Sequence, residues 1–134
     1  MPTSSHSTPL LALDGVAFDT ETTGLDARVA RLVQIAALRL SDGGLVPEER
    51  FETLVNPGRT IPQSAIAVHG ITDAMVADAP PFTAIAPQLE AFVGTATVVG
   101  HTIQYDLAML EREYGLAGRT APRVRALTYA CWRN

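Results

Sequence analysis

The sequence predicts a single α/β domain built on a mixed β-sheet. Strand-like apolar segments come first, and two of them flank a Ser-Asp-Gly-Gly hairpin signal at residues 41–44. Further along, a strand-like segment is followed directly by apolar residues at helical spacing, the pattern of a strand–helix crossover. The chain has 134 residues, the length of one domain. We therefore expect an antiparallel three-stranded start, followed by parallel strands and helices.

Short apolar runs bounded by turn residues define the expected strands. The first run ends at Asp19, and the polar residues 20–26 that follow are expected to form a turn around Gly24. Residues 1–9 are rich in Ser, Thr and Pro and are expected to be disordered. The expected strands are residues 15–18, 32–40, 51–55 and 97–100, with a fifth starting within 123–127.

Helical spacing and capping residues define the expected helices. Pro62 suits a first helical turn, and Thr72 or Asp73 suits an N-cap. Pro87 lies within a helical pattern, so that helix is expected to begin near Ala84, where Pro87 would still fall among the early N–H groups that lack partners. The segments with helical patterns or caps are residues 62–68, 72–76, 82–93 and 103–114.

Composition excludes several classes of protein. Ten basic residues, all of them Arg, face 14 acidic residues, which gives a formal net charge of -4. An acidic chain binds nucleic acid poorly by charge alone, so such a function needs local help, for example from metal ions. The single cysteine, Cys131, allows neither an internal disulfide nor a Cys-rich zinc site. No apolar run reaches the roughly 18 residues of a membrane helix, so we expect a cytoplasmic protein without membrane contact.

Three carboxylates are placed where they could carry chemistry. Asp19 and Glu21 are two residues apart at the end of the first strand, so both could face one point in space. Two close carboxylates resist joint ionisation unless a cation joins them, and hard oxygen ligands suit Mg²⁺ or Mn²⁺. Asp106 lies in the first turn of the last expected helix. The alternatives are a solvated turn for the first two and a helix-dipole partner for Asp106.

These residues belong to segments that resemble the DnaQ-like 3′–5′ exonucleases, the family of the proofreading epsilon subunit of bacterial DNA polymerase III. Residues 19–25, DTETTGL, resemble its first motif, and residues 99–106, VGHTIQYD, resemble its second. The segments 54–57, 61–62 and 68–73 resemble intervening parts of the family in the same order. The resemblance runs from about Gly15 to Arg125.

The resemblance implies an RNase H-like fold and a two-metal mechanism that releases nucleoside 5′-monophosphates from DNA. Asp19 would bridge two Mg²⁺ or Mn²⁺ ions, Glu21 would hold one of them, and Asp106 would help to hold the other. The implied partners are single-stranded or frayed DNA 3′ ends and a DNA polymerase. The implied substrate-binding residues, with Leu25 packing on the terminal base and His69 bordering the site, are Thr22, Thr23, Gly24, Leu25 and His69.

The family's third motif, a His and an Asp separated by four residues, has no match that we accept. His101 and Asp106 have this spacing, but the Val-Val-Gly before His101 and the long amphipathic helix after it match the second motif. We therefore assign no general base and expect residues 1–134 to form one exonuclease-type domain, incomplete at its C-terminus, with the last helices missing. Two alternatives stay open: a truncated non-catalytic module that binds nucleic acid or a partner, and an RNA exonuclease.

Overall fold

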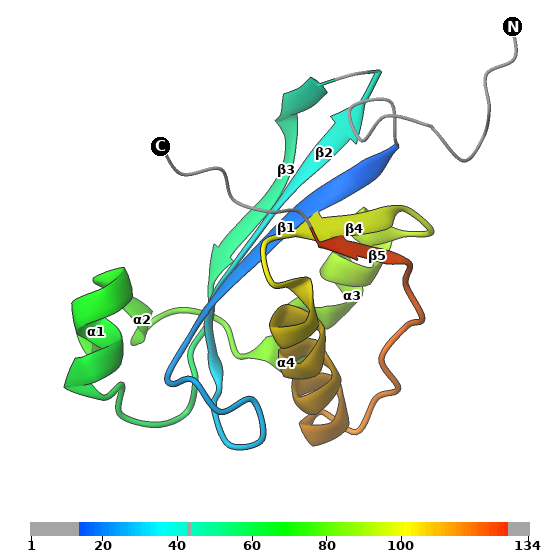
Figure 1. The fold of residues 1–134 in the computed structure, drawn as a ribbon. Coiled ribbons are helices and arrows are strands. Elements are labelled where there is room, and N and C mark those ends of the chain that lie inside the picture. The colour runs from blue at the N-terminus through cyan, green and yellow to red at the C-terminus, as the bar shows by residue number, and fades with distance from the viewer. Residues whose placement is uncertain (1–13, 43, 129–134) are drawn as a thin grey trace, which may run out of the picture.

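In the computed structural model, which describes residues 14–42 and 44–128, five strands form one sheet in the order β3-β2-β1-β4-β5 (Figure 1). β1 pairs with β2 and β2 with β3 in antiparallel fashion, whereas β1–β4 and β4–β5 are parallel. This confirms the predicted mixed sheet. The predictions for residues 1–9 and for Cys131 lie outside the described residues. The strands are β1 Gly15–Thr22, β2 Leu32–Ser41, β3 Gly44–Leu54, β4 Thr97–Gly100 and β5 Ala126–Thr128.

β1 is longer than the sequence indicated. The prediction that a turn begins at Thr20 was wrong, because Thr20 and Glu21 continue the ladder opposite Ile35 and Gln34 of β2. Threonine fits a pleated, half-buried strand well, so its polarity is a poor turn signal here. A register shift after Glu21 then ends the regular pairing. The carboxylates of interest are therefore held by strand geometry rather than by a loop.

The described part of the chain has four helices, and three of them begin close to their predicted positions. Thr72 caps its short helix by accepting a hydrogen bond from the Met75 N–H at 3.3 Å. The prediction that the third helix begins near Ala84 was wrong: it begins at Phe82, whose buried ring packs edge-on against Tyr114 and anchors the first turn. The helices are α1 Gln63–His69, α2 Asp73–Val76, α3 Phe82–Val93 and α4 Ile103–Leu116.

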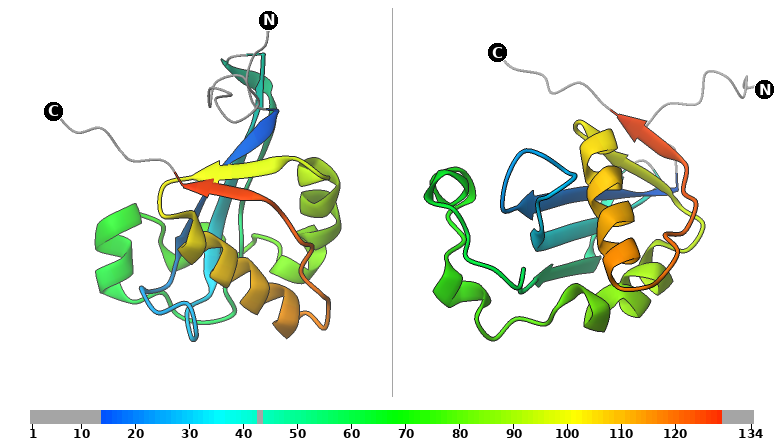
Figure 2. Two further views of the ribbon diagram at one scale, coloured as in Figure 1. Left: turned by 45° about the vertical axis from the view of Figure 1, so that its right-hand side comes forward. Right: turned by 90° about the horizontal axis from the view of Figure 1, so that it is seen from below.

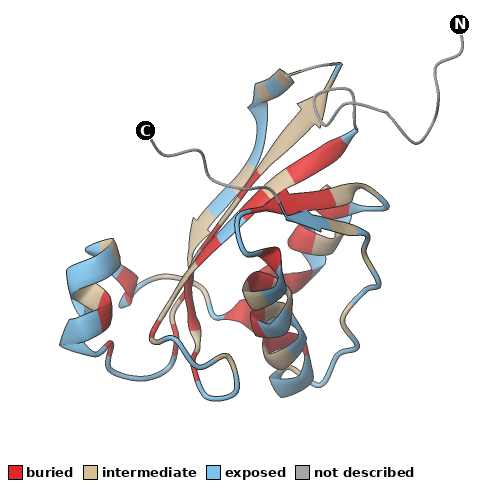
Figure 3. Cartoon of the chain, in the orientation of Figure 1, coloured by how far each residue is buried: buried red, intermediate tan, exposed pale blue. Residues whose placement is uncertain are grey.

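α3 and α4 cover one face of the sheet, and α1 and α2 lie near its end (Figure 2). Side chains from β1, β2, α3 and α4 share one buried cluster, and the buried segments gather at this interface in Figure 3. A second, smaller cluster joins α1 and α2 to β2 around Val33. None of the helices in residues 14–42 and 44–128 is long and apolar enough to cross a bilayer.

A buried ion pair fixes α4 to the start of β2. The Glu113 carboxylate, 1% exposed, accepts hydrogen bonds from Arg31 Nε at 2.9 Å and Arg31 Nη2 at 3.0 Å. The backbone N–H of Leu32 donates a third, at 2.9 Å. A two-pronged guanidinium contact of this kind is geometrically specific, so it sets where the helix lies against the sheet.

Candidate active site

β1 directs its polar residues to two sides. Asp19 is exposed and lies opposite Ala36, on the sheet face away from α3 and α4, whereas Thr20 is buried toward the helices. Strand alternation, on which the prediction for the two carboxylates rests, gives Glu21 the same side as Asp19. A shallow depression on this face is lined by Asp19 together with Ala17, Phe18, Ala36, Ala37, Leu38, Arg50 and Glu52.

A tight turn brings Asp106 against the end of β1. A Cβ added at Gly100 would lie 2.7 Å from the Phe18 carbonyl oxygen, so only glycine allows β4 to approach β1 this closely. Thr102 then adopts the left-handed conformation, with φ 56°, and α4 begins at the next residue. Asp106 in the first turn is 4% exposed, and its Oδ1 accepts a hydrogen bond from the Thr20 hydroxyl at 2.5 Å.

The three carboxylates act on one another electrostatically. Burial raises the pKa of Asp106 from 3.8 to about 6; the negative charges of Asp19 and Glu21 add to this rise, and the Thr20 hydrogen bond opposes it. Burial, followed by the charge of Asp19, also raises the pKa of Glu21, whereas His69 lowers it. The three negative charges therefore repel one another, and a cation bound between them would reduce this repulsion.

Asp19, Glu21 and Asp106 do not converge into a complete metal-binding site. Within residues 14–42 and 44–128, no group of three or more His, Cys, Asp or Glu side chains converges closely enough to hold an ion. The chemistry of the donors nevertheless fits a hard divalent cation, because Asp19, Glu21 and Asp106 offer only carboxylate oxygens. We call these three side chains the acidic cluster because they interact electrostatically, although they lie on two sides of β1 and do not form a coordination sphere.

A cavity of about 560 Å³ adjoins the acidic cluster. Two apolar side chains in its wall are unusually exposed for their size: Leu25 is 95% exposed and Val68, on α1, is 82% exposed. Packing within the domain explains neither, so both are available to a ligand. The lining residues are Thr20, Glu21, Thr22, Gly24, Leu25, Asp26, Ser64, Ala65, Val68, His69 and Tyr105.

Hydrogen bonds within the protein occupy the threonines that follow Asp19. The Thr22 hydroxyl lies 2.7 Å from the Gly24 carbonyl oxygen and 2.9 Å from the Tyr105 hydroxyl. Thr23 is buried, is not among the cavity-lining residues, and accepts a hydrogen bond from the Arg31 N–H at 3.0 Å. These hydroxyls therefore shape the loop and already have partners within the protein, although the family resemblance implied that Thr22 and Thr23 bind substrate.

His69 borders the cavity and supports the same loop. The Ile71 N–H donates to His69 Nδ1 at 3.0 Å, which leaves the Nε2 hydrogen to meet the Thr22 carbonyl oxygen at 3.0 Å. Sequence reasoning missed Val68 and Tyr105 as lining residues. One feature of the sequence could have identified Tyr105 as a lining residue: it directly precedes Asp106 in the first turn of α4. His101, the rejected general base, lies exposed in the turn before that helix.

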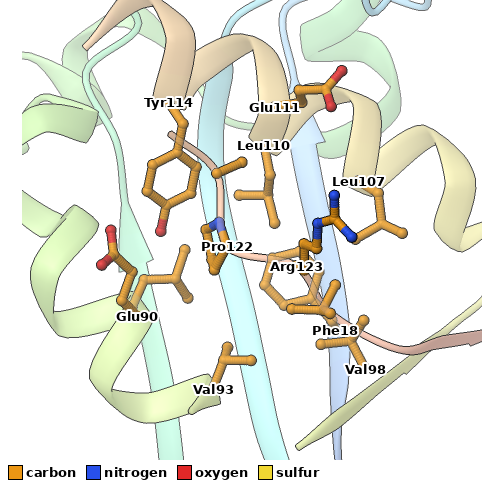
Figure 4. A pocket seen from close by; sticks show the side chains of 13 residues that line it. Phe18, Glu90, Val93, Val98, Leu107, Leu110, Glu111, Tyr114, Pro122 and Arg123 are labelled. Atoms are coloured by element: carbon orange, nitrogen blue, oxygen red, sulfur yellow. The ribbon is translucent and has the colours of Figure 1, made fainter. Parts of the chain in front are cut away.

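A second cavity, of about 350 Å³, lies between α3, α4 and the segment 121–124 (Figure 4). Its lining is mainly apolar, and Leu107, Leu110 and Val98 point into it. It contains none of the residues that the sequence singled out for function. We therefore assign it to the packing of the helical layer and not to the acidic cluster.

Comparison with known sequences finds an exonuclease family model and relatives that match most of this chain. The family model for exonucleases of the RNase_T type matches residues 16–131. A DNA polymerase III subunit epsilon-like protein of Rhodobacter capsulatus is 48% identical over 113 residues, covering 84% of this chain and 16% of that protein. The DNA polymerase III subunit epsilon of Aquifex aeolicus is 37% identical over 102 residues, covering 75% of this chain and 50% of that protein. The chain thus spans half or less of the length of these relatives.

Solved structures with the same fold include two nucleases bound to DNA. Exonuclease X in complex with 5′ overhanging duplex DNA superposes with a TM-score of 0.60 at 35% identity, covering 70% of this chain and 52% of that one. E. coli exonuclease I in complex with a dA13 oligonucleotide superposes with a TM-score of 0.74 at 16% identity, covering 87% and 28%. The second likeness bears on the fold alone, and it agrees with the predicted RNase H-like architecture.

Proposed function

Because this chain belongs to the DnaQ-like exonuclease family, we propose that it is a metal-dependent 3′–5′ exonuclease that releases nucleoside 5′-monophosphates from DNA. One observation carries the proposal beyond family membership. The buried Asp106, held by Thr20, shares an electrostatic field with Asp19 and Glu21 beside a cavity with exposed apolar walls. Such a concentration of negative charge beside an open cavity is typical of a catalytic site.

The metal ligands we propose are the three carboxylates of the acidic cluster. Asp19, Glu21 and Asp106 would together hold two Mg²⁺ or Mn²⁺ ions. When bound, the pair of ions supplies charge that stabilises the attacking and leaving oxygens of a phosphodiester. Thr20 keeps the Asp106 carboxylate oriented by donating to Oδ1. Asp106 lies in a buried environment of low dielectric, which strengthens the attraction of its ionised carboxylate for a cation.

The adjoining cavity has the size and lining expected for a terminal nucleotide. Its volume of about 560 Å³ lies within the roughly 300–1,000 Å³ of small-ligand sites. Leu25 and Val68 present exposed apolar surface on which a base could pack. A Cβ added at Gly24 would meet nothing within 4 Å, so the fold does not require glycine there. We propose that the open space at Gly24 admits the sugar or phosphate of the substrate.

The setting of this activity is inferred from the relatives. Two of them are named as epsilon or epsilon-like subunits of DNA polymerase III, and a nuclease of the same fold at 35% identity binds overhanging duplex DNA. We propose that the substrate is a single-stranded or frayed DNA 3′ end and that a DNA polymerase is the partner. We place this function in the cytoplasm, where the lone cysteine of the chain would stay reduced.

The direct test is release of labelled mononucleotides from a 3′-end-labelled DNA oligonucleotide with Mg²⁺ or Mn²⁺. Asp19→Ala should abolish release, and the matched control Glu48→Ala, which removes an exposed carboxylate from β3, should leave the rate unchanged. Release that survives Asp19→Ala would refute the assignment of the site. An RNA oligonucleotide of the same sequence, assayed in parallel, distinguishes a DNA exonuclease from the RNA exonuclease alternative.

One observation favours a second candidate function, a non-catalytic module that binds nucleic acid or a partner. The described carboxylates do not converge into a three-member metal group. Loss of a metal carboxylate or a general base removes about 10²–10⁴-fold of the rate. Isothermal titration with Mn²⁺ separates the two candidates. Binding of an oligonucleotide without Mn²⁺ uptake or cleavage would support the module, whereas Mn²⁺ binding that is lost in Asp19→Ala would support the enzyme.

A further inference from the structure

Tyr105 connects the helix that carries Asp106 to the loop that lines the cavity. Its hydroxyl donates a hydrogen bond to the Gly24 carbonyl oxygen at 2.5 Å and lies 2.9 Å from the Thr22 hydroxyl. The Thr22 hydroxyl reaches the same carbonyl oxygen at 2.7 Å. Three polar groups thus meet at one point, and two of them lie more than 80 residues from the third in sequence. We call this arrangement the Tyr105 clamp.

The loop at residues 22–25 has little else to hold its exposed tip. Leu25 is 95% exposed, so apolar packing does not fix its position. A Cβ at Gly24 would meet nothing within 4 Å, so the backbone there is not wedged by neighbours either. The other anchors, from His69 to the Thr22 carbonyl and from Arg31 to Thr23, act on the residues before Gly24. The clamp is therefore the contact closest to the tip.

We propose that Tyr105 is a positioning residue that sets where Gly24 and Leu25 stand in the nucleotide cavity. This inference rests on the proposed exonuclease function. Tyr105 acts through Gly24 and Thr22, and its hydroxyl is already engaged within the protein. The clamp therefore orders the wall against which the terminal nucleotide binds, and it contributes no group to the reacting phosphodiester. Its loss should raise KM and leave kcat nearly unchanged, because substrate and transition state lose the same wall contact.

Tyr105→Phe removes only the hydroxyl and keeps the ring in the cavity wall. A hydrogen bond contributes about 0.5–1.5 kcal/mol, which corresponds to a rise in KM of roughly two- to tenfold. The matched control is Tyr114→Phe, about two turns further along α4, whose hydroxyl bonds Glu90 and lines the second cavity. The control should lower stability slightly and leave KM unchanged. Hydrogen exchange at residues 23–26 should quicken in Tyr105→Phe and not in Tyr114→Phe.

Thr22→Val provides an independent check, because it removes the second hydroxyl of the clamp. Within one clamp, the KM effects of Tyr105→Phe and Thr22→Val should be less than additive in the double variant. A Tyr105→Phe protein whose KM and loop exchange match the wild type would overturn the clamp while the exonuclease proposal stands. A fall in kcat at unchanged KM would also overturn it. A wild-type chain that neither cleaves nor binds the oligonucleotide would overturn both.

Discussion

The Thr20 hydroxyl donates a 2.5 Å hydrogen bond to Oδ1 of Asp106, although the two residues are 86 positions apart in the chain. This contact joins β1, which carries Asp19 and Glu21, to α4. It satisfies one oxygen of a carboxylate that is only 4% exposed. A buried carboxylate whose hydrogen bond does not offset its desolvation resists ionisation, and the pKa of Asp106 is accordingly raised to about 6.

The stability of the metal-free protein should fall as pH rises through the range from 4 to 6. The folded pKa of Asp106, about 6, lies above its ordinary value of 3.8, so the folded state binds more protons than the unfolded state in this window. The contribution of neutral Asp106 to the free energy of unfolding is at most about 3 kcal/mol, and it is lost in full by about pH 7. Asp106→Asn keeps an oxygen acceptor for Thr20 and should be the more stable protein at pH 8.

Urea unfolding in EDTA at pH 4, 6 and 8 measures this difference. The free energy of unfolding of Asp106→Asn minus that of the wild type should grow with pH and level off above pH 7. A difference that does not vary with pH would show that Asp106 titrates normally. Addition of Mg²⁺ at pH 8 should stabilise the wild type and not Asp106→Asn, because only the wild type has the proposed ligand.

Removing the charge of Asp19 should lower the pKa of two other carboxyl groups. Asp19 contributes to the raised pKa of both Asp106 and Glu21, so Asp19→Asn should move both values toward normal. The change at Asp106 should be partial, because burial is the larger cause. Titration of carboxyl ¹³C resonances in EDTA measures both groups. Glu48→Gln is the control, and equal titration curves in Asp19→Asn and the wild type would mean that the carboxylates are electrostatically independent.

Breaking the ion pair between Arg31 and Glu113 should be strongly destabilising. Arg31→Met leaves Glu113, 1% exposed, without its guanidinium, and an unpaired buried charge costs about 3–5 kcal/mol. Arg28→Met, which breaks the exposed pair with Asp26, should change stability little. Chemical denaturation compares the two. The double variant Arg31→Met with Glu113→Gln should recover part of the loss, and no recovery would argue that Arg31 stabilises by packing alone.

The mixed antiparallel and parallel sheet was predictable because it follows from local patterns, and the expectation that Asp19 and Glu21 share one side of β1 rests on a local pattern too. Apolar runs and the hairpin signal mark the strands, and two-residue spacing places the carboxylates on one side of β1. The extension of β1 through Thr22 was not predictable, because the pairing with β2 overrides the polarity of the segment. The start of α3 was missed for a similar reason, since the buried Phe82 outweighs the cost of Pro87 inside the helix.

Hydrogen bonds between residues far apart in the chain could not be predicted from local sequence patterns. The resemblance placed Asp106 with Asp19, but nothing local indicated that Thr20 would hold it or that Tyr105 would hold Gly24. Both contacts depend on the close approach of β4 to β1 at Gly100. Tertiary packing decides which group a hydroxyl bonds, so the partners of Thr20, Thr22 and Thr23 could not be predicted from their positions in the sequence.

Filling the second cavity should stabilise the domain without affecting the acidic cluster. The cavity of about 350 Å³ is lined largely by apolar side chains (Figure 4). Ala121 is a small residue in its lining. Ala121→Leu buries additional apolar surface there and should raise the free energy of unfolding by about 1 kcal/mol. Ala108→Leu, at an exposed position of α4, is the matched control and should have little effect. Thermal unfolding measures both variants, and a lower melting temperature for Ala121→Leu would show that the cavity closes in solution and that the larger side chain overpacks it.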